Sequence, residues 1–82
     1  MATVHCIALY RADILQRVEF FGDASERDAF ALGMPVQPGD VVTEWADNLP
    51  AAELEWQVLQ AAISRDYTSS THYTVPQPQS GR

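Results

Sequence analysis

Residues 49–65, LPAAELEWQVLQAAISR, form the longest uninterrupted periodic segment of the 82-residue chain. At 100° per residue its apolar side chains fall on one broad arc and most of its polar side chains fall on the opposite arc, which predicts an amphipathic helix. Pro50 suits the first turn, where a missing N–H costs nothing, and Asp47 or Asn48 would cap the free N–H groups. A helix of this length spans about 25 Å and would cross a small domain.

The apolar arc of this helix is about twice as wide as the ~100° stripe that a surface helix usually buries. Two interpretations follow. In the first, which we favour, strands cover one part of the arc and a second helix or the C-terminal tail covers the rest. In the second, the edge at Trp56 stays open for a partner. Glu55 falls inside the arc, and because an unpaired buried carboxylate is costly, we expect it at an edge that reaches water rather than paired with an arginine or in a contact site.

Three segments before this helix have the composition of strands. Residues 3–10 (TVHCIALY) are apolar on both faces, which is typical of a central strand that is covered on both sides. Residues 14–21 (ILQRVEFF) and 41–45 (VVTEW) alternate in polarity. After the helix, residues 72–75 are a candidate edge strand.

Alternation along the second segment assigns its side chains to the two faces of the sheet. Ile14, Val18 and Phe20 are predicted to face the core. If the other face of the sheet were uncovered, it would carry an apolar patch, which on a small protein often marks an interface. That patch would consist of Ile7, Leu9, Leu15 and Phe21.

A short helix is predicted between the second and third strands. Asp23 and Glu26 have the spacing of a capping box, Ser25 and Asp28 offer a second register, and the helix would run to about Leu32. Gly33 suits the left-handed position that often follows a helix. Residues 37–40 (QPGD) predict a tight turn, with Pro and Gly at its two central positions.

These elements predict an α+β fold. It would be a small, mainly antiparallel sheet in the order β-β-α-β-α, with an extra C-terminal strand as an option and one long amphipathic helix packed on it. Residues 1–75 would form a single domain with a modest core. Residues 76–82, which are rich in Pro, Gln and Ser, would form a mobile tail.

The charge of the chain limits its function classes. Eleven acidic residues are set against five arginines, so the net charge is −6, and the pI is near 4.5. This balance argues against direct binding to nucleic acid, which needs a basic patch, and it is compatible with a basic protein partner. The absence of lysine and the abundance of alanine indicate a GC-rich genome, of a bacterium or its phage.

The chain shows no targeting signal. The sequence predicts neither a signal peptide nor a transmembrane helix, and no membrane binding is expected. One cysteine excludes an intramolecular disulfide. We therefore expect a cytoplasmic protein.

Few residues could carry out catalysis or bind a metal. The only imidazole and thiol groups are those of His5, Cys6 and His72. His5 and Cys6 would point to opposite faces of one strand, so only His72 could pair with Cys6 as a nucleophile and base. The spacing of zinc ligands and a phosphate-binding glycine loop are both missing. We expect no catalytic, cofactor-binding or metal-binding residues, and Cys6 is interpreted as a small core residue.

The carboxylates are interpreted first as a solvated surface. The functional alternative is an acidic surface beside the two tryptophans, because tryptophan is enriched at interface hot spots. We interpret Trp45 as core, and we leave Trp56 evenly balanced between core and interface. The candidate partner contacts are Glu44, Asp47, Glu53, Glu55 and Trp56.

The leading hypothesis is a small, acidic, non-enzymatic interaction protein that inhibits or modulates a larger, basic, nucleic-acid-binding protein. Phage proteins that block host defence, including anti-CRISPR proteins, share this profile as a class and not in any motif. A second hypothesis is a homodimer or an accessory subunit that buries its spare apolar face in an assembly. A third is a small enzyme or ligand binder that uses Cys6 and His72. Under the second hypothesis, for the homodimer and the accessory subunit alike, the interface would be formed by Leu9, Leu15, Phe21 or Trp56.

Overall fold

The computed structural model describes residues 1–67 and 69–78. Within these residues the order is β-β-α-β-α-β, and the four strands form one antiparallel sheet in the spatial order β2-β1-β3-β4. The predicted α+β class is confirmed, and the candidate edge strand is present as β4. The elements are β1 Ala2–Arg11, β2 Ile14–Phe21, α1 Ala24–Gly33, β3 Val41–Leu49, α2 Leu54–Ser64 and β4 Thr71–Thr74.

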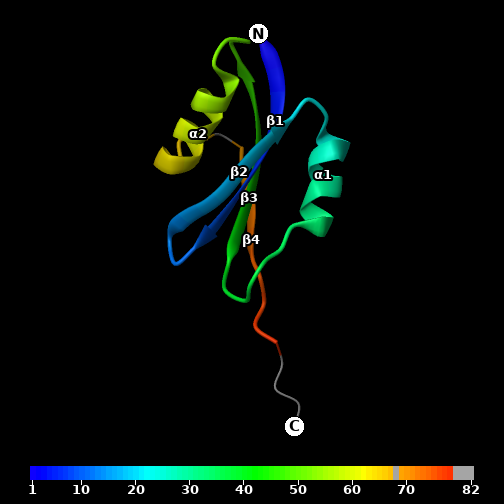
Figure 1. Ribbon diagram of the computed structural model, residues 1–82, viewed down its shortest axis with the longest axis vertical. Coiled ribbons are helices and arrows are strands. Elements are labelled where there is room, and N and C mark those ends of the chain that lie inside the picture. The colour runs from blue at the N-terminus through cyan, green and yellow to red at the C-terminus, as the bar shows by residue number, and fades with distance from the viewer. Residues whose placement is uncertain (68, 79–82) are drawn as a thin grey trace.

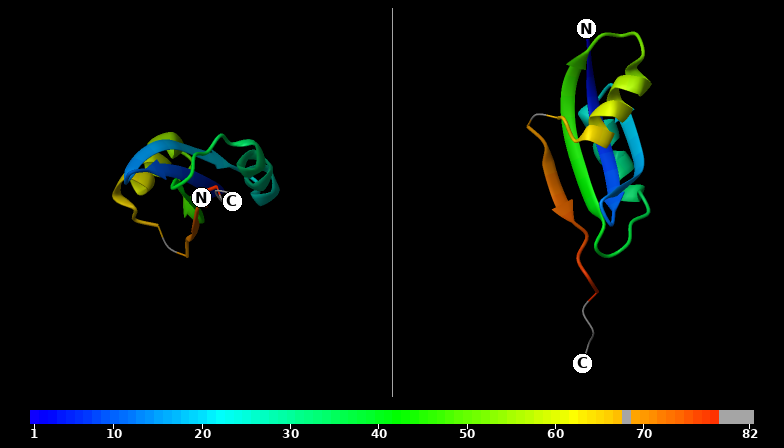
Figure 2. Two further views of the ribbon diagram at one scale, coloured as in Figure 1. Left: turned by 90° about the horizontal axis from the view of Figure 1, so that it is seen from below. Right: turned by 90° about the vertical axis from the view of Figure 1, so that its left-hand side faces the viewer.

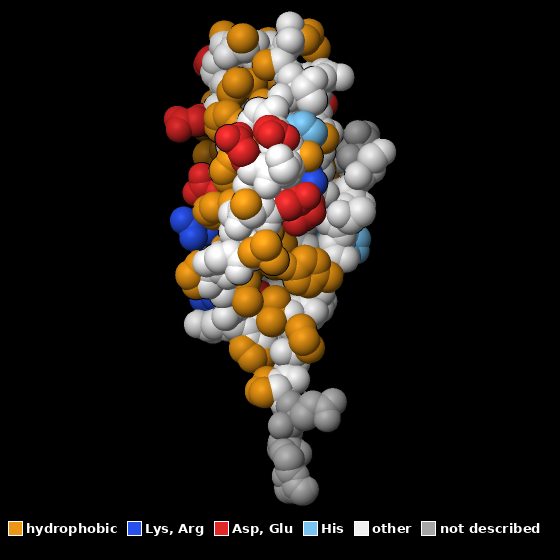
Figure 3. Space-filling model, turned by 90° about the vertical axis from the view of Figure 1, so that its right-hand side faces the viewer, with side chains coloured by type: hydrophobic (Ala, Val, Ile, Leu, Met, Phe, Trp, Pro, Cys, Tyr) orange, Lys and Arg blue, Asp and Glu red, His pale blue; other side chains and the backbone are white. Residues whose placement is uncertain are grey.

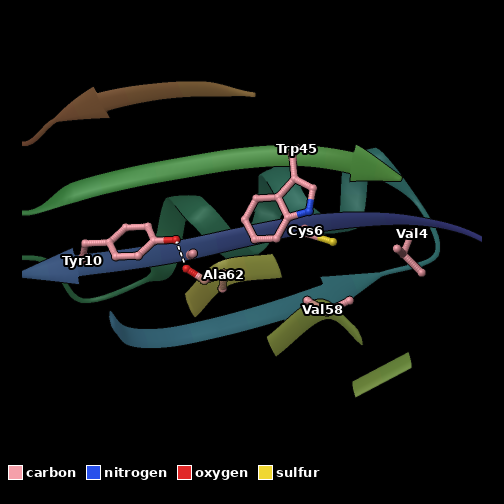
Figure 4. Packing of buried hydrophobic residues seen from close by; sticks show 7 residues of the cluster. Val4, Cys6, Tyr10, Trp45, Val58 and Ala62 are labelled. Atoms are coloured by element: carbon pink, nitrogen blue, oxygen red, sulfur yellow. Dashed lines mark hydrogen bonds between the residues drawn. The ribbon is translucent and has the colours of Figure 1, made fainter. Parts of the chain in front are cut away.

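The two helices cover opposite faces of the sheet (Figures 1 and 2). Beneath α2 lies a core in which alternate residues of β1, including Cys6 and Tyr10, pack with Trp45 of β3 and with Val58 and Ala62 of α2 (Figure 4). This packing explains why β1 is apolar on both of its faces, since the intervening side chains of β1 are buried on the other side.

The second face of the sheet is covered as well. Ile7 and Leu9 of β1 and Val42 of β3 are buried there with Met34, which follows α1. The ring of Phe21 in β2 packs against that of Phe30 in α1, with 5.3 Å between centroids. The apolar patch that an uncovered face would have exposed is therefore absent among the described residues, because α1 and the segment after it lie over it.

The side-chain assignment of β2 was wrong at its start. Leu9 pairs with Arg17 but Tyr10 pairs with Leu15, so Gln16 is an extra residue in β2, as in a β-bulge. The extra residue reverses the alternation before it. Leu15 therefore packs on the α2 side with Val18 and Phe20, and Ile14 is 64% exposed instead of facing the core.

The long helix begins later than predicted. β3 continues to Leu49, because its ladder with β1 extends to the pair Ala2–Leu49, so neither Asp47 nor Asn48 caps the helix. Pro50 lies in the connection, and α2 starts at Leu54. The N-cap residue Glu53 has φ of +62° and makes no side-chain cap.

The short helix and the turn after it largely follow the predictions. Asp23 accepts a hydrogen bond of 3.1 Å from the backbone N–H of Ser25 and caps α1. Gly33 is the last helical residue and lacks the expected positive φ, because the chain leaves α1 in an extended conformation at Met34. The 37–40 turn is confirmed, with φ of +90° at Gly39 and a 3.0 Å hydrogen bond from the N–H of Asp40 to the carbonyl of Gln37.

The end of β4 is tied to this turn. The N–H of Val75 donates to the carbonyl of Asp40 at 2.8 Å, and the N–H of Gly39 donates to the carbonyl of Val75 at 2.9 Å. The mobile tail predicted for residues 76–82 overlaps the described chain only at 76–78, and residues 79–82 lie outside it.

Candidate interaction surface

The exposed side of α2 carries two large apolar side chains. Val58 and Ala62 of α2 are buried, whereas Trp56 and Ile63 are each 57% exposed. Residues seven apart lie two turns apart on one side of a helix, so these two side chains share the outer part of the arc. The strands cover one part of the wide arc, as expected, but the short helix lies on the other face of the sheet and leaves the edge at Trp56 open.

A groove runs between α2 and the end of β3. Its volume is about 300 Å³. The β3 side is formed by Asp47 and Leu49, the helix side includes Trp56 and Gln60, and Asp66 lies beyond the end of α2. The groove therefore combines an indole ring with two carboxylates, and no basic side chain lines it within the described part of the chain.

The five predicted contact residues are not all on one surface. Asp47 and Trp56 line the same groove. Glu55 lines a different groove of about 480 Å³, on the opposite flank of α2 beside β2. Glu53 is exposed at the start of α2. Glu44 faces the α1 side, where its carboxylate lies 3.8 Å from the guanidinium of Arg27.

The arginines of the described residues are all engaged with carboxylates of the chain. Arg11 binds Asp40, Arg17 lies 3.7 Å from Glu19, Arg27 contacts Asp28 and Glu44, and Arg65 lies 3.6 Å from Asp13. Outside these ion pairs, the carboxylates in residues 1–67 and 69–78 are those of Asp23, Glu26, Asp47, Glu53, Glu55 and Asp66.

Four of these six carboxylates surround α2. Glu53 and Glu55 lie at its start, Asp66 follows its end, and Asp47 faces it from β3. The excess negative charge of the chain is thus concentrated around the helix that exposes Trp56. Asp66 and Leu49 had not been singled out as contacts, and no local signal marks them, because only the pairing of β3 and the path of the chain after α2 bring them to Trp56.

Cys6 and His72 are not brought together. Cys6 is fully buried beneath α2, and this burial raises the pKa of its thiol to about 12. His72 lies on β4, which is separated from β1 by β3, and it lines a pocket of about 250 Å³ with Tyr10, Arg65 and Tyr67. Among the described residues, no group of three or more His, Cys, Asp or Glu side chains could hold a metal ion.

The α1 side carries a second exposed apolar surface. Leu32 is 92% exposed near the C-terminal end of α1, and Val36 in the following segment is exposed too. In the view of Figure 3, which faces this side, the apolar side chains gather toward the lower half and the acidic ones lie above them. The exposed tryptophan of the described residues, Trp56, lies on α2 and not on this surface.

The described residues contain no helix that is both long and apolar enough to cross a membrane. In comparisons with protein-family models, with curated proteins and with solved structures, no match to the chain was found.

Proposed function

We propose that this protein is a small acidic interaction protein, without catalytic activity, that inhibits or modulates a larger nucleic-acid-binding protein by occupying its basic surface. The observation that supports this proposal is the position of the unpaired carboxylates. Among the described residues, four of the six carboxylates outside ion pairs surround the helix that exposes Trp56, whereas the ion-paired carboxylates are spread over the rest of the chain.

This arrangement suits a basic partner for two reasons. A surface of one charge sign steers an oppositely charged partner and raises the association rate. An exposed tryptophan at the same surface provides a large apolar contact of the kind that dominates binding energy at interfaces. Small acidic proteins that phages use against host defence share this general profile as a class, and this protein is proposed to act on a basic partner in that way.

The proposal is tested by comparing how well wild type and two matched variants capture a basic partner protein. The first variant, Asp47→Asn with Glu53→Gln and Glu55→Gln, removes three carboxylates around α2. The second, Asp23→Asn with Glu26→Gln and Asp28→Asn, removes three carboxylates at α1 and leaves the same net charge. Asparagine is as good an N-cap as aspartate, so position 23 should still cap α1.

Wild type and both variants are immobilised and exposed to nuclease-treated lysate of a GC-rich bacterium at low salt. We expect wild type and the α1 variant to retain one basic, nucleic-acid-binding protein that elutes at moderate salt, and we expect the α2 variant to lose it. Equal retention by both variants, or retention of no basic protein by wild type, would contradict the proposal.

A homodimer is the second candidate, and the exposure of Trp56 and Ile63 on one side of α2 favours it. Of the four residues expected at the interface, Leu9 is buried, Leu15 and Phe21 are half-buried in the two cores, and Trp56 is exposed. Two copies that met through α2 would bring together two surfaces of the same negative charge, so association should strengthen with salt. Sedimentation equilibrium at low and high salt measures this, and a monomer at both would exclude the dimer.

A further inference from the structure

The outer edge of β3 is only partly covered. β3 pairs with β1 along its whole length, from Val41 to Leu49. β4 pairs with β3 only from Val41 to Glu44. Among the described residues, no strand lies beside residues 45–49 on the outer side, and Figure 2 (right) shows β4 alongside only one half of β3.

The open edge lies directly beside the groove described above. The side chains of Asp47 and Leu49, which form one wall of the groove, belong to the open half of β3. Trp56 forms the opposite wall, and Asp66 lies at its end. A strand placed next to residues 45–49 would therefore direct its alternate side chains into the groove, on the same face of the sheet as α2.

The charge of the groove selects the side chain that would enter it. Within residues 1–67 and 69–78, neither Asp47 nor Asp66 forms an ion pair, and the indole of Trp56 is exposed. A guanidinium group can stack on an indole ring and at the same time form hydrogen bonds with carboxylates, which makes arginine the best match.

We propose that an extended, arginine-bearing peptide segment of a partner protein adds to the sheet as a strand at residues 45–49 of β3, with an arginine side chain in the groove between Trp56 and Asp47. This inference rests on the proposed function, because it specifies how a basic partner would be held. Addition of a strand to an open sheet edge is a common mode of peptide recognition, in which main-chain hydrogen bonds provide affinity and alternate side chains provide specificity.

The other two edges of the sheet are less suited to strand addition. β2 contains the bulge at Gln16 and the ion pair of Arg17 and Glu19, features that discourage pairing at an edge. β4 has only four residues, and Pro76 follows soon after it. The open half of β3 contains neither a proline nor a bulge.

One backbone group at this edge is held by a local contact. The N–H of Asn48 donates a 2.8 Å hydrogen bond to the carboxylate of Asp47. This is a short-range contact between neighbours on an exposed part of the chain. The arginine of an incoming strand can bind the carboxylate of Asp47, and a carbonyl of that strand can then accept the N–H of Asn48. In the free protein, the carboxylate of Asp47 thus accepts the hydrogen bond of a backbone N–H at the open edge. In the complex, the same carboxylate binds the arginine side chain of the partner.

The test uses three synthetic peptides of eight residues with blocked ends. The first alternates Arg with Val, the second replaces each Arg with Lys, and the third is the Arg peptide with alternate amides N-methylated, so that it keeps its side chains but loses the donors of one edge. Affinities are measured by titration calorimetry with the full chain, and backbone amide exchange is followed by NMR.

We expect the Arg peptide to bind and to slow the exchange of alternate amides within residues 45–49. N-methylation should weaken binding by about tenfold or more, because several main-chain hydrogen bonds are lost. The Lys peptide should bind about threefold to tenfold more weakly, since lysine cannot stack on the indole and bond in bidentate geometry.

Two protein variants locate the side-chain contact. Trp56→Ala should weaken binding of the Arg peptide by about fivefold. Ile63→Ala removes an equally exposed side chain of the same helix that does not line the groove, and it should change affinity by less than about twofold.

Equal binding of the N-methylated peptide, or exchange protection elsewhere than residues 45–49, would overturn strand addition. Equal effects of Trp56→Ala and Ile63→Ala on affinity would overturn the placement of the arginine side chain in the groove. Absence of binding by the Arg peptide would overturn both. Each of these outcomes leaves the proposed function standing if the α2 variant still loses its basic partner in the capture experiment, so the two failures are distinguishable.

Discussion

The guanidinium of Arg11, at the end of β1, holds the carboxylate of Asp40 in bidentate geometry, with both N–O distances at 2.9 Å. The side chain of Asp40 is 1% exposed, and its second oxygen also accepts the N–H of Gln37 at 2.8 Å. Its backbone carbonyl accepts the N–H of Val75. Asp40 therefore joins the central strand, the turn before β3 and the end of β4.

Replacing Asp40 should test this junction. Asp40→Asn keeps the shape of the side chain but removes the charge that Arg11 binds, so the urea midpoint at pH 7 should fall. Hydrogen bonds from Arg11 lower the pKa of Asp40 below its usual value. Its contribution is therefore present above the unfolded pKa of about 4 and is lost as the pH falls through the lower folded value. The gap between the midpoints of wild type and variant should narrow below pH 4.

The control for this prediction is Asp28→Asn. Asp28 lies 3.3 Å from Arg27 but is exposed, and surface ion pairs contribute little. Its variant should keep nearly the wild-type midpoint at pH 7. A gap for Asp40→Asn that stays constant down to pH 2 would mean that the charge of Asp40 is not the source of its effect.

Truncation of Val58 should show how strongly α2 is held to the sheet. Val58→Ala removes two buried methyl groups and leaves a small cavity, which should lower the free energy of unfolding by about 2 kcal/mol. Ile63→Ala is the matched change on the exposed side of α2, and it should stay within about 0.5 kcal/mol of wild type. Urea titrations followed by tryptophan fluorescence measure both. Similar losses for the two variants would mean that the exposed side of α2 is packed in solution.

Much of the fold could be predicted from local patterns. β1 was recognised from its two apolar faces, α1 from the cap at Asp23, and the 37–40 turn from its Pro-Gly pair. In each case, the residues that determine the conformation are neighbours in the chain. The α+β class then followed from the order of these elements.

The predictions were wrong where the local structure depends on pairing with residues that are distant in the sequence. The bulge at Gln16 depends on how β2 pairs with β1, and nothing within ILQRVEFF marks it. The start of α2 was misplaced because Pro50 fits a first helical turn as well as a connection. Only the ladder with the first residues of β1 extends β3 to Leu49.

The same limit applies to the candidate surface. The breadth of the apolar arc of α2 was visible, but which part of it stays uncovered depends on the position of α1. Glu44 was grouped with Asp47 by proximity in the sequence, yet their side chains point to opposite faces of the sheet. Charge counts alone cannot separate a carboxylate that is paired within the chain from one that is free to meet a partner.

The hydroxyl of Tyr10 should matter more than that of an exposed tyrosine. It donates a 2.6 Å hydrogen bond to the carbonyl of Ala62 in the last turn of α2 (Figure 4). Tyr10→Phe leaves this buried carbonyl without its donor and should lower the free energy of unfolding by about 1.5 kcal/mol. Tyr73→Phe, on the exposed strand β4, should change it by less than about 0.5 kcal/mol. Equal effects of Tyr10→Phe and Tyr73→Phe would show that the hydrogen bond between Tyr10 and Ala62 makes no measurable contribution to the free energy of unfolding.

The thiol of Cys6 provides a probe of opening of the core beneath α2. Desolvation by burial, with a smaller contribution from the charge of Asp47, raises the pKa of this thiol to about 12. Since only the thiolate attacks a disulfide reagent, the native protein at pH 8 should react with Ellman's reagent at least about a thousandfold more slowly than the urea-unfolded chain. Val58→Ala should speed the reaction, because it destabilises the helix that covers Cys6. Ile63→Ala should leave the rate unchanged. Native protein that reacts as fast as the unfolded chain would mean that α2 does not shield Cys6 in solution.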